Sequence, residues 1–212
     1  SQKVIQYGSE GLVLQEWMDE QTTIFFYEKI IATHYQMKQN DAAEAVTLQA
    51  IEFADKSGEK PKKLDFLLSL GESYLLANKF EHALEIYQQA LDVAQRIQKM
   101  VDYSYLIGRI GIIHAELGQL DKAIQHHQQA ILHAQKHKIV ELEAEQAVMI
   151  AMAYRDKGEL THAKAYCQRG IEIYANADLD AEANNARQLL AEIEAGLDWN
   201  FTPRRKVVFM YS

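Results

Sequence analysis

Small residues return in this sequence every forty positions. Alanines occupy one row and glycines two others, which are Ala43, Ala83, Ala123 and Ala163, then Gly71 and Gly111, then Gly118 and Gly158. A row of large apolar residues keeps the same interval: Ile51, Leu91, Ile131 and Ile171. A fixed period of this length is typical of chains that repeat one supersecondary unit and bury its apolar face against the next copy. The period therefore predicts a stack of similar units.

Each unit reads as two helices joined by a short turn. Its apolar and small residues follow the i, i+3, i+4, i+7 spacing of one helical face, with an interruption at Asn78. Gly118 and Gly158 interrupt the later units, and both residue types accept the left-handed conformation that ends a helix. The chain has only two prolines, Pro61 and Pro203, so nothing between them forbids helix. Each unit is predicted to be a helical hairpin.

The small residues have a packing role in this prediction. Glycine at positions 71 and 111, and alanine at 151, leave space for the second helix of the hairpin to approach. The alanines at 83, 123 and 163 are expected to fill that close contact from the other side. Since one hairpin cannot bury both of its faces, the hairpins must stack.

The residues of one unit resemble the tetratricopeptide repeat. The match is Leu67-x2-Leu70-Gly71-x2-Tyr74 followed by Ala83-x3-Tyr87-x2-Ala90. The resemblance covers about residues 20–196 and implies an all-α fold, a right-handed α-solenoid of about four hairpins plus a C-terminal capping helix. Two features depart from the family: the period is forty residues instead of about 34, and the proline that usually closes the second helix is absent. Longer second helices, such as one over 120–138, are expected.

The chain is predicted to have three parts, an N-terminal segment (1–19), a repeat domain (20–196) and a C-terminal tail (197–212). The repeat domain divides into units at 24–63, 64–103, 104–143 and 144–180, followed by a capping helix at 181–196.

Charge and hydropathy exclude several classes of partner. The formal net charge is −8, so the body of the chain is not expected to attract nucleic acid or anionic membranes. No stretch reaches the roughly 18–20 consecutive apolar residues of a membrane span, and the first residues lack the pattern of a secretion signal. The single cysteine, Cys167, fits a reducing compartment. We expect a cytoplasmic protein, and the first residue, Ser1, leaves open that the chain is a fragment of a longer one.

The sequence contains none of the common catalytic motifs, which include GxxxxGK[ST], GxSxG, HExxH and CxxC. Cys167 shares the register of Tyr87 and His127, which faces the partner helix inside the hairpin. We interpret it as a small buried hydrophobe and not as a nucleophile. The prediction is a protein that is not an enzyme and needs no cofactor.

Four of the eight histidines stand within one predicted second helix. His126, His133 and His137 share one stripe, and the i, i+4 pair His133 and His137 is a weak candidate for chelating a transition metal, with Glu141 or Glu145 as third ligand. The other units carry apolar residues at the registers of His126 and His133, which favours ordinary packing along a half-buried seam. A seam that responds to protonation is the third interpretation.

The resemblance also implies where a partner binds, because the first helices of this family line a concave groove. Transferring their outward registers gives a candidate partner-binding set of mixed charge with apolar anchors: Glu28, Lys29, Ser69, Glu72, Leu76, Tyr105, Arg109, Ile112, Glu116, Glu145, Met149, Met152 and Arg155. The predicted function is a non-catalytic scaffold or adaptor that binds a peptide or helix of a partner protein. The alternative is a ligand- or peptide-sensing regulatory domain of a larger transcription or signalling protein.

Both ends of the chain contain β-prone segments, Lys3–Tyr7 and Lys206–Tyr211. One interpretation is that these are tails ordered by packing against the solenoid. The other is that the apolar C-terminal tail docks in a groove, its own or a neighbour's, as a built-in ligand or a dimer contact. A homo-oligomer formed through the tail therefore stays open.

Overall fold

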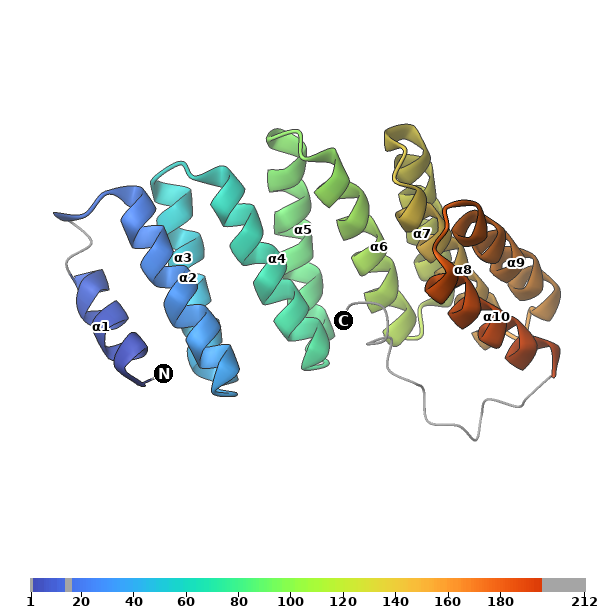
Figure 1. The fold of residues 1–212 in the computed structure, drawn as a ribbon, viewed down its shortest axis with the longest axis horizontal. Coiled ribbons are helices and arrows are strands. Elements are labelled where there is room, and N and C mark those ends of the chain that lie inside the picture. The colour runs from blue at the N-terminus through green and yellow to red at the C-terminus, as the bar shows by residue number, and fades with distance from the viewer. Residues whose placement is uncertain (1, 14–16, 196–212) are drawn as a thin grey trace.

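The computed structural model describes residues 2–13 and 17–195, and over these residues the chain contains ten α-helices and no strand (Figure 1). The helices are α1 (Gln2–Val13), α2 (Glu20–Gln36), α3 (Asn40–Lys56), α4 (Lys60–Leu76), α5 (Phe80–Arg96), α6 (Met100–Glu116), α7 (Leu120–His137), α8 (Val140–Asp156), α9 (Leu160–Asn176) and α10 (Asp180–Glu194). None of the described helices combines the length and the apolar character needed to cross a membrane.

Left-handed residues end the helices at the predicted turns. Asn78, Gly118 and Gly158 have φ of 57°, 72° and 78°. The residue after each of them bonds back across the end of the helix, as when the N–H of Lys79 donates to the carbonyl of Tyr74 over 2.8 Å. This bond satisfies a carbonyl that the helix itself leaves without a partner. The prediction of a left-handed residue at these three turns is confirmed.

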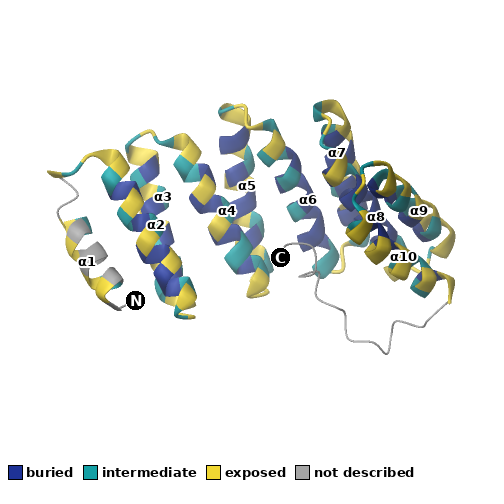
Figure 2. Cartoon of the chain, in the orientation of Figure 1, coloured by how far each residue is buried: buried dark blue, intermediate teal, exposed yellow. Residues whose placement is uncertain are grey.

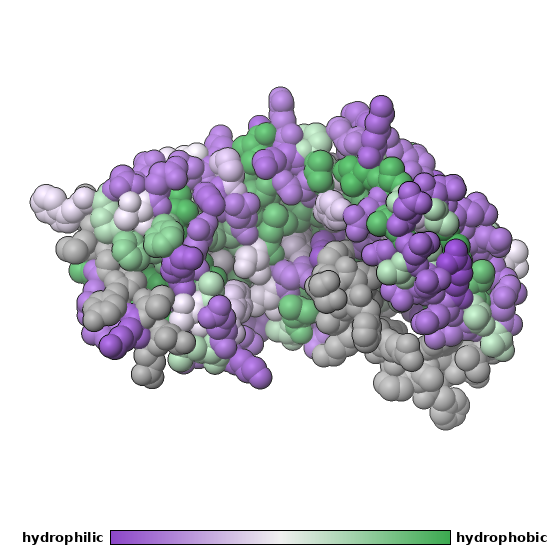
Figure 3. Space-filling model, in the orientation of Figure 1, coloured by the Kyte–Doolittle hydropathy of each residue, from purple (hydrophilic) through white to green (hydrophobic). Residues whose placement is uncertain are grey.

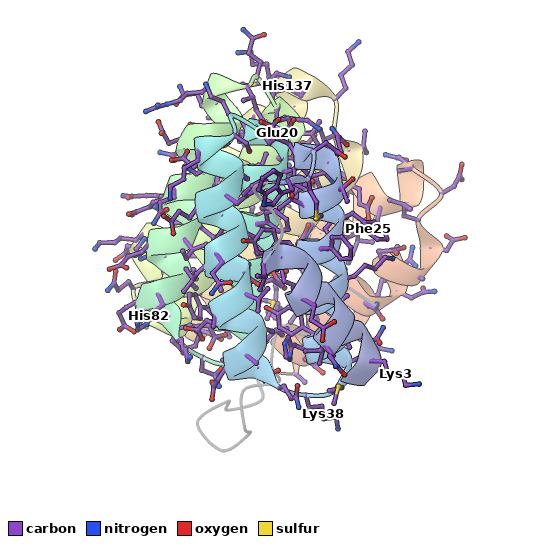
Figure 4. The ribbon with its side chains drawn as sticks, turned by 90° about the vertical axis from the view of Figure 1, so that its left-hand side faces the viewer. Lys3, Glu20, Phe25, Lys38, His82 and His137 are labelled. Carbon is purple, nitrogen blue, oxygen red and sulfur yellow. The ribbon has the colours of Figure 1, made fainter. Side chains whose placement is uncertain are left out.

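The helices form two layers, with the first helices of the hairpins in one layer and the second helices in the other. In Figure 1, α2 lies in front of α3, and α4 and α6 lie on the same side as α2. Glu20, which begins α2, and His137, which ends α7, lie at one edge of the solenoid, whereas Lys38, in the turn after α2, lies at the opposite edge (Figure 4). Figure 4 also places Phe25 of α2 and His82 of α5 on opposite faces. The first helices of the hairpins thus share one face of an α-solenoid, as the sequence predicted.

Aromatic rings fill the spaces at Gly71 and Gly111, which corrects the expectation that alanines fill them. A Cβ at Gly71 would overlap the ring of Tyr87, and a Cβ at Gly111 would lie 2.7 Å from Cε1 of His127. The alanines at 83, 123 and 163 are completely buried, but they are not the groups that enter these spaces. A methyl group is too short to cross from one helix to the other, so the longer side chain one turn further along the second helix makes the contact.

Buried residues concentrate between the two layers (Figure 2). One cluster joins the second and third hairpins and includes Leu67, Leu70, Leu106 and Ile113. Each such side chain contributes roughly 1.5–3 kcal/mol through burial. This cluster holds α4, α5 and α6 in fixed relative positions.

Residues 2–13 are helical, so the expectation that Lys3–Tyr7 is β-prone was wrong. These residues belong to α1, which packs against α2 and places Leu12 against the cluster around Ile24 and Tyr27. β-Propensity is weak and yields to tertiary packing of this kind. The matching expectation for Lys206–Tyr211 lies outside the described residues.

Candidate functional site

A groove of about 570 Å³ opens between α4 and α6, and two side chains of α5 also border it. Figure 3 shows hydrophobic residues gathered across the middle of this face, between hydrophilic ones. The groove is lined by Leu68, Glu72, Leu75, Leu76, Asn78, Phe80, Tyr87, Asp102, Tyr105, Leu106, Arg109, Ile112 and Glu116.

Helical spacing explains why α4 and α6 supply the walls. On α4, Leu68 and Leu75 stand seven residues apart, which places them on one stripe of the helix. On α6, Leu106 and Ile112 are buried, whereas Leu76 at the end of α4 is 54% exposed. The groove therefore has an apolar base and an apolar residue on its open rim, an arrangement that can hold a hydrophobic side chain of a ligand.

The polar groups of the groove are mainly acidic. The hydroxyl of Tyr87 donates to Oε2 of Glu72 over 2.9 Å, and Nη2 of Arg109 lies 3.5 Å from the same oxygen. Asp102 and Glu116 add two carboxylates, so the lining that the structure describes holds three acids and one base. Since Glu72 already shares its charge with Arg109, the groove favours a ligand that carries positive charge.

Six residues of the predicted partner-binding set line this groove: Glu72, Leu76, Tyr105, Arg109, Ile112 and Glu116. Three others lie on α2 and α4, away from it. Glu28 pairs with Lys62 across 2.8 Å, Lys29 lies over the ring of Phe25 with its Nζ 5.2 Å from the centroid, and Ser69 is exposed. The structure thus brings together the middle of the predicted set.

The four predicted residues of α8 do not line the groove. Glu145 and Met149 are buried, Met152 is half-buried, and Arg155 pairs with its neighbour Asp156 across 2.8 Å. Glu145 is still electrostatically close to the wall formed by α6. Burial raises the pKa of Tyr105, and the carboxylates of Glu141 and Glu145 raise it further.

The residues that form the base of the groove, among them Leu68, Leu75, Phe80 and Leu106, were not part of the predicted partner-binding set. The transferred registers identify the outward-facing residues of each first helix. The groove instead lies between two first helices, α4 and α6, and reaches the second helix α5 behind them. The seven-residue spacing of Leu68 and Leu75 was the available signal, because it places two leucines on the side of α4 that faces α6.

The histidine stripe of α7 contacts α6, and none of its residues lines the groove. His127 is 1% exposed, and its Nδ1 lies 2.7 Å from Oε1 of Gln146 on α8. Burial lowers the pKa of His127 to about 4. His126 stacks on His114 with centroids 5.0 Å apart. His126 and His114 fill the seam between α7 and α6, as the packing interpretation of the stripe expected, whereas His127 lies outside the stripe and contacts α8.

The metal candidates His133 and His137 stack with their ring centroids 6.4 Å apart, and His133 also packs on Tyr103 of α6 at 5.1 Å. Within residues 2–13 and 17–195, no three histidine, cysteine, aspartate or glutamate side chains are grouped to hold a metal ion. The two imidazoles therefore have no third ligand among the described residues, and neither Glu141 nor Glu145 serves as one.

Cys167 is buried, and its thiol donates to the carbonyl oxygen of Ala186 over 3.2 Å. Burial raises the pKa of the thiol to about 11. Its burial confirms the interpretation of Cys167 as a small buried side chain, and the raised pKa keeps the thiol protonated near neutral pH.

Models of the tetratricopeptide repeat match residues 23–96 and 147–176. The residues that these models match are tetratricopeptide repeats. No curated protein sequence matches it.

Solved structures share the fold of this tetratricopeptide repeat chain. The apo form of RapI superposes with a TM-score of 0.72 at 20% identity, covering 83% of this chain and 64% of RapI. A Rap conjugation gene regulator of plasmid pLS20, in complex with the Phr* peptide, gives 0.64 at 16% identity and covers 90% and 53%. A putative kinesin light chain from Podospora anserina gives 0.61 at 15% identity and covers 84% and 96%. The chain thus spans less than two thirds of either Rap protein, and these likenesses establish the α-solenoid fold.

Proposed function

We propose that this chain is a non-catalytic protein-interaction domain that binds a peptide segment of a partner in the groove between α4 and α6. The observation that carries the proposal is the combination of an apolar base, an exposed rim residue at Leu76 and an acidic border around Arg109. Such a groove can bury one or two apolar anchor side chains while carboxylates fix the orientation of the peptide. The Rap regulator in complex with the Phr* peptide supports it, since the two chains share a fold.

The groove can be tested with a matched pair of leucine substitutions. Leu76→Glu places a charge on the rim, and Leu132→Glu makes the same change on α7, where Leu132 is 65% exposed and outside the groove. Peptides selected from a random library against the unmodified chain should bind the Leu76→Glu variant at least about tenfold more weakly, because an apolar anchor contributes roughly 1.5–3 kcal/mol. The Leu132→Glu variant should bind them unchanged. Selected peptides that bind both variants equally well would place the binding site elsewhere.

A second proposal is that the chain is the sensing part of a larger regulatory protein. It is supported by length, because the chain covers only 64% of RapI and 53% of the pLS20 regulator. Sequencing the complete transcript in its source organism tests it, since an adjoining effector domain is required.

A further inference from the structure

The groove between α4 and α6 has a chemistry that restricts its occupant. Its base is apolar, and its charged groups are three carboxylates, Glu72, Asp102 and Glu116, against the single guanidinium of Arg109 in the described lining. Arg109 lies 3.5 Å from Glu72. Asp102 and Glu116 are fourteen residues apart on α6, which places them about 21 Å apart along the helix. An occupant should therefore be an extended apolar segment with positive charge next to it.

One segment of this chain has that composition. Residues 199–212 read WNFTPRRKVVFMYS, with three cations at Arg204, Arg205 and Lys206, an apolar run over 207–211, and no acidic residue. Pro203 fixes its own φ and restricts the residue before it to extended conformations, which lowers the entropy that docking costs. The apolar run would extend about 17 Å as a strand, close to the length between the two carboxylates of α6.

The segment also starts at a suitable place. Because successive helices alternate in direction, α4, α6 and α10 all end at the same edge of the solenoid (Figure 1). Three helix-to-helix steps of about 10 Å each separate α10 from the groove. The eleven steps from Ala195 to Lys206 reach about 37 Å when the chain is extended, so this segment can bridge the distance and bring the cations to the edge where Glu116 ends α6.

We propose that the groove binds the chain's own segment 199–212, with Arg204–Lys206 beside Glu116 and the apolar run 207–211 directed along the base toward Asp102. This inference rests on the proposed function, because it names an occupant for the same groove. A tethered ligand has an effective concentration in the millimolar range, so an external peptide must displace it. The tethered segment thereby lowers the apparent affinity of the groove for any external peptide.

The test uses the full chain and a fluorescent synthetic peptide of residues 199–212, followed by fluorescence anisotropy. The variant Val207→Glu/Phe209→Glu removes the apolar anchors of the tethered segment and leaves the groove intact. The peptide should bind this variant at least about tenfold more tightly than the unmodified chain, because the competitor is gone. Adding Leu76→Glu to the variant should abolish that binding, and adding the matched change Leu132→Glu should leave it unchanged.

Three outcomes would overturn the proposal. Equal affinity for the unmodified chain and the tail variant would show that the segment does not occupy the groove. A dimer of the unmodified chain in light scattering, together with a monomeric tail variant, would show that the groove holds the segment of a second copy. The third outcome is that the 199–212 peptide binds no variant, while library-selected peptides bind and lose affinity with Leu76→Glu. This result would refute the tethered ligand and leave the proposed function standing. If the peptide binds through Leu76 and the library gives no binder, the proposed function fails and the tethered ligand stands.

Discussion

Acid should weaken the contact between α7 and α8, and the size of the effect follows from the surroundings of His127. The ring is 1% exposed, and its Nδ1 lies 2.7 Å from Oε1 of Gln146. Burial lowers the pKa of His127 to about 4, from about 6.5 in the unfolded chain. The hydrogen bond to Gln146 raises the pKa and the neighbouring His126 lowers it, but both effects are smaller than that of burial.

The sign follows from where each state takes up a proton. Above about pH 6.5 the imidazole is neutral in both the folded and the unfolded state, so the contribution of His127 to stability does not change with pH. Between about pH 6.5 and pH 4 only the unfolded chain binds the proton, so stability falls by up to about 1.4 kcal/mol per pH unit as the solution becomes more acidic. Near pH 5 the loss should be about 2 kcal/mol, and below about pH 4 it should level off near 3 kcal/mol.

The assay compares the unmodified chain with His127→Gln by urea unfolding near pH 7.5 and near pH 5, followed by helical circular dichroism. A glutamine at 127 can still donate a hydrogen bond to Gln146 but cannot titrate. Carboxylates also make both proteins less stable in acid. Burial raises the pKa of Glu44, for example, but the hydrogen bonds from Lys79 and Tyr74 lower it overall. This effect is the same in both proteins and cancels in the comparison. The unmodified chain should lose about 2 kcal/mol more than the variant over this interval. Equal losses would refute the assignment of the acid sensitivity to His127.

Three further outcomes are expected. Gly71→Ala should lower stability by about 1–3 kcal/mol because its methyl group would overlap the Tyr87 ring, whereas Ser69→Ala on the exposed face of the same helix should change it by less than about 0.5 kcal/mol in the same urea titration. Tyr87→Phe removes the 2.9 Å hydrogen bond to Glu72 and should cost about 1 kcal/mol; an unchanged unfolding midpoint would show that the bond contributes nothing. Cys167 should react with a disulfide reagent near pH 8 only at the rate of unfolding, and a fast reaction in the native chain would contradict its burial.

The sequence predicted the helices well because a repeat states the same information several times. A single Asn78 is weak evidence for a turn, but Gly118 and Gly158 at the same register make the boundary unambiguous. α1 was missed because it lies before the first repeat, so no second copy corrected the β-propensity of its valine and isoleucine.

The groove could be predicted only in part, for a geometric reason. Tyr105 and Arg109 were identified because their register places them on the face of the first helices. The depth of the groove depends on the space between α4 and α6, and that space is set by how two hairpins pack, which no local periodicity encodes. Phe80 therefore borders the groove although it begins a second helix.

A buried row of polar residues shows how a repeated fold still keeps each hairpin distinct. Four residues at intervals of forty face the inside of their hairpins: Thr47, Tyr87, His127 and Cys167. Each has a different polar partner. Thr47 donates to the carbonyl of Ala43 in its own helix, and Tyr87 donates to Glu72 of the preceding helix.

His127 and Cys167 instead bond forward, to Gln146 of α8 and to the carbonyl of Ala186 in α10. If the stack slipped by one hairpin, the apolar rows would still match, since they recur every forty residues. The partner of His127 would not match, because the other units have Phe66, Leu106 and Ala186 at the register of Gln146, and a buried group left unsatisfied costs about 1–3 kcal/mol. The hydrophobic repeat therefore determines that the hairpins stack, whereas the bond from His127 to Gln146, which crosses from one hairpin to the next, favours a single order of stacking.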